Sequence, residues 1–482
     1  MHTTPDFFRS SVLSRAGRTV WIGAYALWER RVPFFRPETI ERLQRWRLQK
    51  IIRHAWQTVP FYQKIMTERG LRPSDFRTAK DLEKLPLIGF SDVARDPRMF
   101  RSSLYPDRSC LCLQTAGSSR GFGLRIYWDR ASALNKVAHA ERDRVVLARL
   151  AGRNWGQDQI HVIGRSSGRV RRYVEAGMLT PQRLIRRVEL TSDTPVEQVA
   201  DRINQVRPQV VFSYGSFAEI FFRTIRDSGK PVCWPRVWCY GGDALAADVR
   251  RMMEEQGCTV HSTYQATETG RLGFECECRR GFHLNIDLCA VRLIETGEHG
   301  FDRINRNPPQ EAGTGEPLRS DWTPGAESAV RNVPAGEVGE LVISNLHNRA
   351  MVLLNLRLGD LGVIDPAPCE CGRSLPVLKE LRGRVSQLIR RSDGTLISAL
   401  TLRHLMADQF GLALQSQIVY QPPGLFIWRI VPATGKSGTE VAAAFKQATE
   451  RILGPGIRVE VQIAPALPVS ESGKFRTFVQ RT

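Results

Sequence analysis

Residues 237–268 read VWCYGGDALAADVRRMMEEQGCTVHSTYQATE, in which two apolar runs enclose an amphipathic stretch. The runs Val237–Gly241 and Thr259–Tyr264 are short and β-rich, which predicts two strands. Between them, Ala246–Glu255 has the apolar spacing of a helix. A strand, a helix and a second strand in this order indicate an α/β sheet with helical crossovers.

The same alternation extends on both sides of this unit. Gln159–Gly164 and Val210–Tyr214 are predicted strands, and Phe217–Arg226 is a predicted helix. Further along, residues 297–331 are rich in Gly, Pro and charge and are predicted to form a long loop. Glu340–Ser344 and Met351–Leu356 are then predicted strands of a smaller β unit. The fold class is therefore α/β.

The C-terminal hundred residues have a different pattern. Three predicted strands alternate with two predicted helices, and they are Gln417–Tyr420, Leu425–Val431, Arg458–Ile463, Leu400–Gln409 and Thr439–Leu453. We therefore expect a large N-terminal domain over residues 1–382 and a small α+β domain over 383–482, joined by a short basic linker.

The N-terminal hundred residues are predicted to be mainly helical. Pro37–Met66 has helical apolar spacing, and so does the basic, aromatic stretch Phe7–Phe35. Two interpretations of the second stretch stay open. It is either a helix packed on the body through Trp21, Tyr25 and Trp28, or a helix that lies on a membrane surface.

Charge and apolar length exclude several classes of protein. The 69 basic and 49 acidic residues give a net charge of +20. The basic residues are spread along the chain and not clustered, and only 10 of them are lysines. We therefore expect no nucleic-acid partner. The apolar run Thr19–Trp28 is far shorter than the roughly 20 residues of a membrane span, and residues 1–9 lack a secretory pattern. We expect a cytoplasmic protein without a transmembrane segment. The sequence does not reveal its oligomeric state.

Four short segments carry groups that suit phosphate chemistry. Thr115–Gly121 is a loop of small and hydroxyl residues, whose backbone N–H groups could approach an anion. Thr267 and Glu268 follow the strand that ends at Tyr264, where ligands bind in open α/β sheets. Asp360 lies in a predicted turn, and Lys474 follows Gly473 near the chain end.

The order of these segments resembles the adenylate-forming acyl ligases, and within them the phenylacetate-coenzyme A ligase-like branch, over nearly the whole chain. The stretch 391–398, Arg-Ser-Asp-Gly-Thr-Leu-Ile-Ser, is similar to members from capsule and polysaccharide loci. The marks of the branch are Val59-Pro60-Phe61-Tyr62, Leu85-Pro86-Leu87, Gly241-Gly242-Asp243-Ala244, Phe274-Glu275-Cys276, Gly281-Phe282-His283, Cys369-x-Cys371-Gly372-Arg373 and Gly473-Lys474-Phe475.

This resemblance implies a large adenylation core, a mobile C-terminal lid domain and a two-step reaction. A carboxylate attacks the α-phosphate of ATP to give acyl-AMP and pyrophosphate, and coenzyme A then displaces AMP. Mg²⁺ and Lys474 would neutralise the phosphates. The implied roles are triphosphate binding by Thr115, Gly117, Ser118 and Ser119, adenine contact by Gly241, Gly242, Asp243 and Tyr264, phosphate contact by Thr267, Mg²⁺ binding by Glu268, ribose binding by Asp360, a hinge position for Arg384 and catalysis by Lys474.

The chain departs from the family pattern at four positions: Arg120 in the phosphate loop, Gln265 before the Thr-Glu pair, and Ser386 and Gln387 at the hinge. Two alternatives therefore accompany the ligase hypothesis. One is an adenylyltransferase that stops at the AMP adduct, and the other is a catalytically weak nucleotide-binding scaffold.

Closely spaced cysteines predict a metal site. The pairs Cys276-x-Cys278 and Cys369-x-Cys371, together with His283, offer sulfur and imidazole ligands that suit four-coordinate Zn²⁺. The resemblance implies that Cys276, His283, Cys369 and Cys371 are the ligands of a structural zinc, which pins a β unit over about residues 270–380. The sequence does not identify the carboxylate substrate.

Overall fold

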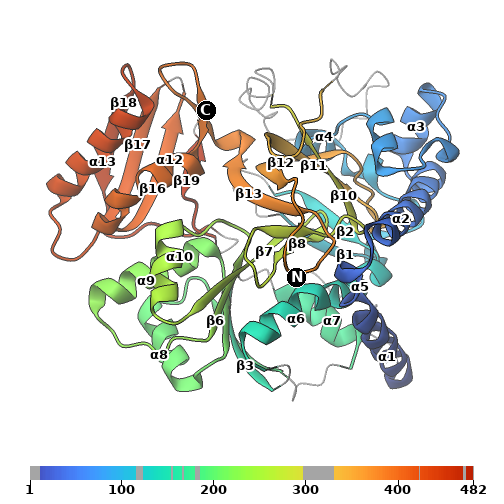
Figure 1. Ribbon diagram of the computed structural model, residues 1–482, viewed down its shortest axis with the longest axis horizontal. Coiled ribbons are helices and arrows are strands. Elements are labelled where there is room, and N and C mark those ends of the chain that lie inside the picture. The colour runs from blue at the N-terminus through green and yellow to red at the C-terminus, as the bar shows by residue number, and fades with distance from the viewer. Residues whose placement is uncertain are drawn as a thin grey trace.

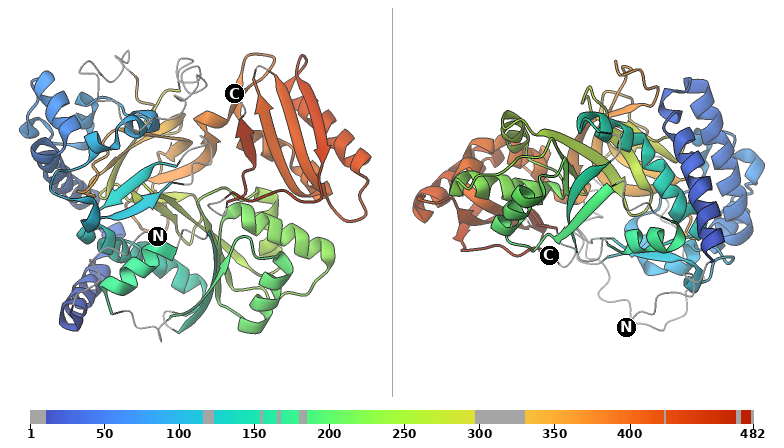
Figure 2. Two further views of the ribbon diagram at one scale, coloured as in Figure 1. Left: turned by 180° about the vertical axis from the view of Figure 1, so that it is seen from behind. Right: turned by 90° about the horizontal axis from the view of Figure 1, so that it is seen from below.

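The computed structural model describes residues 11–115, 123–153, 156–164, 168–179, 185–296, 330–422, 424–470 and 474–480. A large α/β body carries a smaller C-terminal domain beside it (Figures 1 and 2). No helix in these ranges is long and apolar enough to cross a membrane.

The body is organised around one mixed sheet of eleven strands in the order β10-β11-β12-β13-β9-β8-β7-β6-β5-β3-β4. One half is parallel, as the strand and helix alternation predicts. It contains β3 (Gln157–Ile163), β4 (Ile185–Thr191), β5 (Val210–Ser213), β6 (Val237–Gly241) and β7 (Thr259–Ala266), with α8 (Val196–Val206), α9 (Gly215–Ser228) and α10 (Ala247–Glu255).

The other half of the sheet is antiparallel and corrects one prediction. We expected a smaller β unit, but its strands continue the large sheet through β8 and β9. Met351–Leu356 is not a strand. Two of its backbone N–H groups bond outside the sheet, because that of Val352 donates to the Phe100 carbonyl and that of Leu354 donates to the Tyr62 hydroxyl. In addition, Asn355 has a positive φ. The strands are β8 (Gly270–Glu275), β9 (Phe282–Leu284), β10 (Cys289–Ile294), β11 (Val338–Asn345), β12 (Leu356–Asp365) and β13 (Val377–Arg384).

Helices pack around this sheet. The N-terminal helical stretch divides in two at Pro60, which cannot donate a backbone hydrogen bond within a helix. In α1, Tyr25 and Trp28 pack inward as one interpretation expected, whereas Trp21 is 68% exposed. The helices are α1 (Val12–Glu29), α2 (Pro37–Thr58), α3 (Pro60–Glu68), α4 (Phe90–Arg95), α5 (Arg130–His139), α6 (Glu141–Leu150) and α7 (Gly168–Gly177), and the hairpin β1 (Leu111–Gln114) and β2 (Arg125–Trp128) precedes α5.

The C-terminal domain, which we call the lid, has its own hydrophobic core around Trp428, Phe445 and Phe426. The predicted boundary at 382/383 falls inside β13, which stays in the large sheet until Arg384. The lid contains β14 (Leu388–Arg390), β15 (Leu396–Ser398), α12 (Ala399–Leu405), β16 (Ala413–Gln421), β17 (Leu425–Pro432), α13 (Gly438–Leu453), β18 (Arg458–Ile463) and β19 (Phe478–Gln480).

A buried ion cluster fastens the N-terminal helices to the sheet. Arg142 on α6 donates two hydrogen bonds of 2.8 Å to Asp287 and one of 2.6 Å to Glu29 at the end of α1. Arg47 on α2 also contacts both carboxylates. All four side chains are almost completely buried, so each charge depends on its partners.

We expect Asp287→Ala to lower the free energy of unfolding by about 3–5 kcal/mol, because it leaves two buried guanidinium groups short of an anion. Urea unfolding followed by circular dichroism measures this loss. Glu450→Ala is the matched control, since Glu450 pairs with Lys446 at the exposed surface and should cost at most about 1 kcal/mol. Equal losses in the two variants would contradict this role of the cluster.

Candidate functional site

The ends of three parallel strands meet at one edge of the sheet. Tyr214 follows β5, Gly242 follows β6, and Thr267 follows β7. Because β5, β6 and β7 are adjacent and parallel, these positions are neighbours. This edge is where an open α/β sheet binds its ligands.

Lys474 reaches this edge from the lid. Its ammonium group donates a hydrogen bond of 2.8 Å to the carbonyl oxygen of Gly242 and lies 5.4 Å from the centre of the Tyr214 ring. Gly242 has a φ of +86°, and a Cβ there would come within 3.2 Å of the lysine nitrogen. A side chain at position 242 would thus both strain the backbone and displace Lys474.

Carboxylates of the core lie close enough to the Lys474 ammonium to affect its pKa. Burial lowers the pKa of Lys474, while the charges of Asp243, Asp360 and Glu268 act in the opposite direction. The structure therefore brings together a lid cation and three acidic groups that the sequence assigned to the same site, Asp243, Asp360 and Glu268.

Asp243 has a structural partner of its own. One carboxylate oxygen accepts hydrogen bonds from the backbone N–H groups of Gly215 and Ser216, and the other accepts one of 2.5 Å from the Ser216 hydroxyl. Asp243 thus caps the N-terminus of α9. Nucleotide contact by Gly241, Gly242 and Asp243 stays a prediction.

The turn that carries Thr267 and Glu268 is held by its backbone. Trp128 donates from its indole nitrogen to the carbonyl of Thr267 at 3.2 Å, and Asn345 donates to that of Glu268 at 2.8 Å. A third contact joins the His347 ring to the carbonyl of Thr269 at 3.2 Å. The backbone of this turn is fixed by groups other than the Thr267 and Glu268 side chains, so its position is set in advance.

Asp360 lies between two groups that the sequence assigned to the site. It accepts a hydrogen bond of 2.7 Å from the Tyr264 hydroxyl and forms an ion pair of 2.9 Å with Arg384. Asp360 and Arg384 are direct cross-strand partners in β12 and β13. The pair stands where the sheet ends and the lid begins, and the charge of Asp360 raises the pKa of Arg384.

The phosphate loop is only partly described. Thr115 and Leu124 pair at the base of the loop. The N–H group of Thr115 donates to the Leu124 carbonyl, and the Thr115 hydroxyl accepts from the N–H group of Leu124, both at 2.8 Å. Gly117, Ser118 and Ser119 lie outside the described residues, as does Arg120. Triphosphate binding by this loop stays a prediction.

Lys136 is a site residue that the sequence reasoning missed. It lies on α5, its nitrogen is 3.2 Å from the centre of the Trp128 ring, and its pKa is lowered by burial to about 7 although Glu268 opposes the shift. Its position beside Glu268 depends on packing between α5 and the β7–β8 turn. The sequence carries no local signal of that contact, because Lys136 occurs within an ordinary helical pattern.

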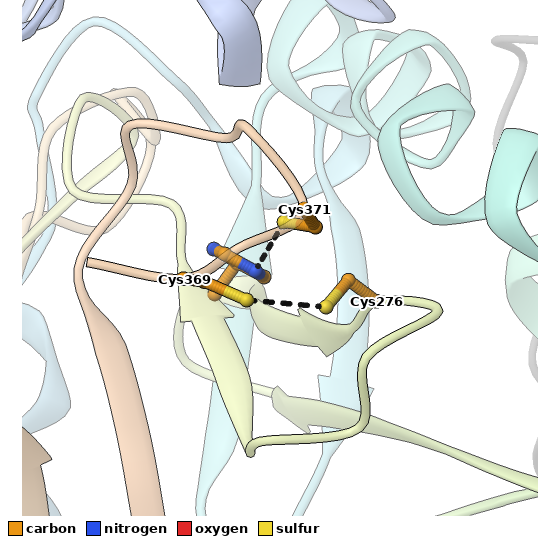
Figure 3. A group of neighbouring side chains, drawn as sticks. Cys276, Cys369 and Cys371 are labelled. Atoms are coloured by element: carbon orange, nitrogen blue, oxygen red, sulfur yellow. Dashed lines mark hydrogen bonds between the residues drawn. The ribbon is translucent and has the colours of Figure 1, made fainter. Parts of the chain in front are cut away.

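The predicted metal ligands converge. The ligand atoms of Cys276, His283, Cys369 and Cys371 all lie within 4.8 Å of one another. Figure 3 shows Cys276 and Cys369 directed toward each other, with 3.7 Å between their sulfurs, and the Cys371 sulfur is 3.2 Å from Nε2 of His283. Cys278 is exposed and does not belong to this group.

The histidine of this cluster is oriented for coordination. Nδ1 of His283 lies 3.1 Å from the carbonyl oxygen of Leu375, to which it can donate only if it carries the proton. Nε2 then presents its lone pair to the sulfurs, and burial lowers the pKa of His283 to about 4, which keeps the ring neutral. The four residues fit a tetrahedral metal site that would join β8 and β9 to the segment before β13.

A second contact region holds the lid against the core. Arg403 of α12 forms an ion pair of 2.8 Å with the buried Glu219 on α9. Arg223, also on α9, contacts Glu219 and Asp248 and donates a hydrogen bond of 2.8 Å to the carbonyl of Phe410 in the lid. These contacts support the lid orientation in which Lys474 reaches Gly242.

Comparison with curated proteins identifies coenzyme A ligases. A phenylacetate-coenzyme A ligase of Thermus thermophilus is 23% identical over 367 residues, which cover 73% of this chain and 72% of that protein. The Escherichia coli phenylacetate-coenzyme A ligase is 24% identical over 367 residues, covering 75% of this chain and 73% of that protein. No protein-family model matches the chain.

Comparison with solved structures identifies the fold. The 2-hydroxyisobutyryl-CoA ligase in the postadenylation state superposes with a TM-score of 0.69 at 17% identity, covering 94% of this chain and 91% of that one. In the thioesterification state the TM-score is 0.55 at 16% identity, with 93% and 91% covered. The fold is that of the adenylate-forming ligases, as the sequence predicts, and the sequence is similar to those of phenylacetate-coenzyme A ligases.

The lowered pKa of Lys136 gives the stability of the protein a specific pH dependence. Between pH 7 and 10.5 the unfolded chain keeps the Lys136 proton that the folded chain has released, so stability rises with pH. Lys136→Met removes this contribution. We expect its stability relative to the wild type to be more favourable at pH 6.5 than at pH 9, by urea unfolding. An identical difference at both pH values would contradict the burial of this charge.

Proposed function

We propose that the protein is an ATP-dependent acid–thiol ligase that forms AMP. In the first step a carboxylate oxygen of the substrate bonds to the α-phosphorus of ATP, and pyrophosphate leaves. In the second step the thiolate of coenzyme A bonds to the acyl carbon, and AMP leaves. The substrate is a small carboxylic acid, as the names of the relatives suggest for those proteins.

One observation carries this proposal. The lid lysine Lys474 meets the core at Gly242, with the Glu268 and Asp360 carboxylates close enough to influence its pKa. A cation on a separate domain can neutralise the phosphates during the first step and withdraw for the second. The closed lid also keeps water from an acyl-AMP, which would otherwise hydrolyse.

The core residues would bind and orient the nucleotide. The Asp360 carboxylate, fixed by Tyr264 and Arg384, is an acceptor for ribose hydroxyls, and the turn at Thr267 presents a hydroxyl to phosphate. Glu268 is a buried oxygen ligand of the type that Mg²⁺ prefers. When bound, Mg²⁺ would neutralise charge on the transferring phosphate.

We further propose that the Cys/His cluster holds a structural zinc. Three sulfurs and one neutral imidazole are soft and borderline ligands, and four protein ligands leave no open position for chemistry. The site joins distant parts of the large sheet.

Two observations bear on the cellular role. The similarity of residues 391–398 to capsule-locus members supports a product that serves surface polysaccharide biosynthesis. None of the ten cysteines forms a disulfide in the structure, which suits a reducing compartment such as the cytoplasm.

Pyrophosphate release from ATP and Mg²⁺, assayed across a panel of carboxylic acids, tests the first step. We expect at least one acid to stimulate release, and Lys474→Ala to lower the rate by at least about 100-fold, because phosphate charge is no longer neutralised. Glu268→Gln should also lower the rate. Lys436→Ala removes an exposed lid lysine and should leave it unchanged.

Addition of coenzyme A separates the remaining alternatives. Faster turnover with formation of an acyl thioester supports the ligase. Release that coenzyme A does not alter indicates an adenylyltransferase that stops at the adduct. ATP binding without release for any acid favours a nucleotide-binding scaffold, and the absence of ATP binding contradicts the assignment.

Metal analysis tests the zinc proposal. We expect about one zinc per chain, and Cys276→Ser to lower both the zinc content and the thermal midpoint, since structural zinc contributes directly to folding free energy. Cys278→Ser is the matched control and should retain the metal. Full zinc content in Cys276→Ser would contradict the ligand set.

A further inference from the structure

The N-terminal helix α1 turns an apolar face away from the rest of the protein. Among the described residues, five of the thirteen large apolar side chains that are exposed lie on this one helix. At roughly 100° per residue, most of them fall on a single stripe with small residues between them. The stripe consists of Leu13, Gly17, Val20, Ala24 and Leu27, with Val12 and Trp21 at its margins.

The opposite face of α1 is attached to the rest of the body by hydrogen bonds, so the stripe faces outward. Arg15 donates a hydrogen bond of 3.0 Å to the carbonyl of Met178, and Arg18 donates one of 2.7 Å to that of Gly177. Glu29 at the end of the helix belongs to the buried ion cluster. Figures 1 and 2 show α1 at the periphery of the body, far from the lid. The exposed stripe is therefore a property of the folded body and not of a loose segment.

The charges around the stripe favour a negatively charged partner. Between residues 11 and 36 the only acidic residue is Glu29, which is buried. The exposed residues Arg30, Arg31 and Arg36 follow the helix directly, and the whole chain has a net charge of +20. A second copy of the chain would bring the same positive charge, whereas an anionic lipid surface attracts it.

We infer that α1 is a peripheral docking surface for an anionic lipid bilayer. The helix lies in the interface with Leu13, Val20 and Trp21 in the acyl region, and the arginines that follow it contact phosphate headgroups. It does not cross the bilayer, because it is neither long nor apolar enough. The inference does not depend on the proposed function, since none of these residues lies in the candidate site.

Co-sedimentation of the full chain with vesicles tests this inference. We expect binding to vesicles of phosphatidylcholine mixed with phosphatidylglycerol, weaker binding to phosphatidylcholine alone, and a marked loss of binding at about 1 M salt, where charges are strongly screened. Trp21→Ser should weaken binding about tenfold, because one large apolar side chain no longer enters the acyl region. The double variant Arg30→Gln, Arg31→Gln should weaken it by a similar factor.

Leu405→Ser is the matched control, since Leu405 is a comparably exposed apolar residue on the lid. It should bind vesicles as the wild type does, and all variants should keep the wild-type thermal midpoint. Absence of binding to anionic vesicles would overturn the inference, and so would equal binding by Trp21→Ser and the wild type. Light scattering that shows a dimer which Trp21→Ser dissociates, without vesicle binding, would assign the stripe to a second copy instead.

Discussion

The hydrogen bond between Lys474 and the Gly242 carbonyl joins two domains at the point where the parallel strands end. It is possible only because position 242 has no side chain and because the lid lies in one particular orientation. That orientation depends in turn on the ion pair between Glu219 and Arg403 of the lid, and on the hydrogen bond that Arg223 donates to the Phe410 carbonyl. This contact places the Lys474 cation close to the Glu268 and Asp360 carboxylates. The Asp360–Arg384 pair and the hydrophobic core of the lid hold these charges in place.

On the core side of the site, hydrogen bonds from three side chains hold the backbone in place. Trp128, Asn345 and His347 contact the carbonyls of the turn that carries Thr267 and Glu268, so that turn need not reorganise when a ligand arrives. The Cys/His cluster and the Asp287 ion cluster fasten the surrounding strands and helices. By contrast, the Asp360–Arg384 pair lies at the end of β13, directly before the lid. The pair therefore ties the last residue of β13 to the large sheet.

Local patterns in the sequence predicted much of this architecture. The four parallel strands and two helices that were predicted there are correct to within a few residues, because periodicity reports which face is buried, whereas β4 and α8 were not predicted. The antiparallel half was misjudged as a separate unit, since register between strands distant in sequence leaves no local pattern. Pro60 divides a helix that the apolar spacing alone treated as continuous. In the site, the motif residues were found in order along the chain, but Trp128, Lys136 and His347 contribute through long-range packing that no motif encodes. The close spacing of sulfur and imidazole groups predicted a metal site, and the resemblance implied the four ligands that converge in the structure.

The central step of the proposed reaction is the transfer of a carboxylate oxygen to the α-phosphorus of ATP. The most direct measurement uses an active acid labelled with ¹⁸O in its carboxylate, together with ATP, Mg²⁺ and coenzyme A, followed by mass spectrometry of the nucleotide product. The account predicts AMP that carries one ¹⁸O atom, because the carboxylate oxygen remains on the phosphorus when the thiolate displaces AMP. Unlabelled AMP, or ADP with the label in inorganic phosphate, would contradict it.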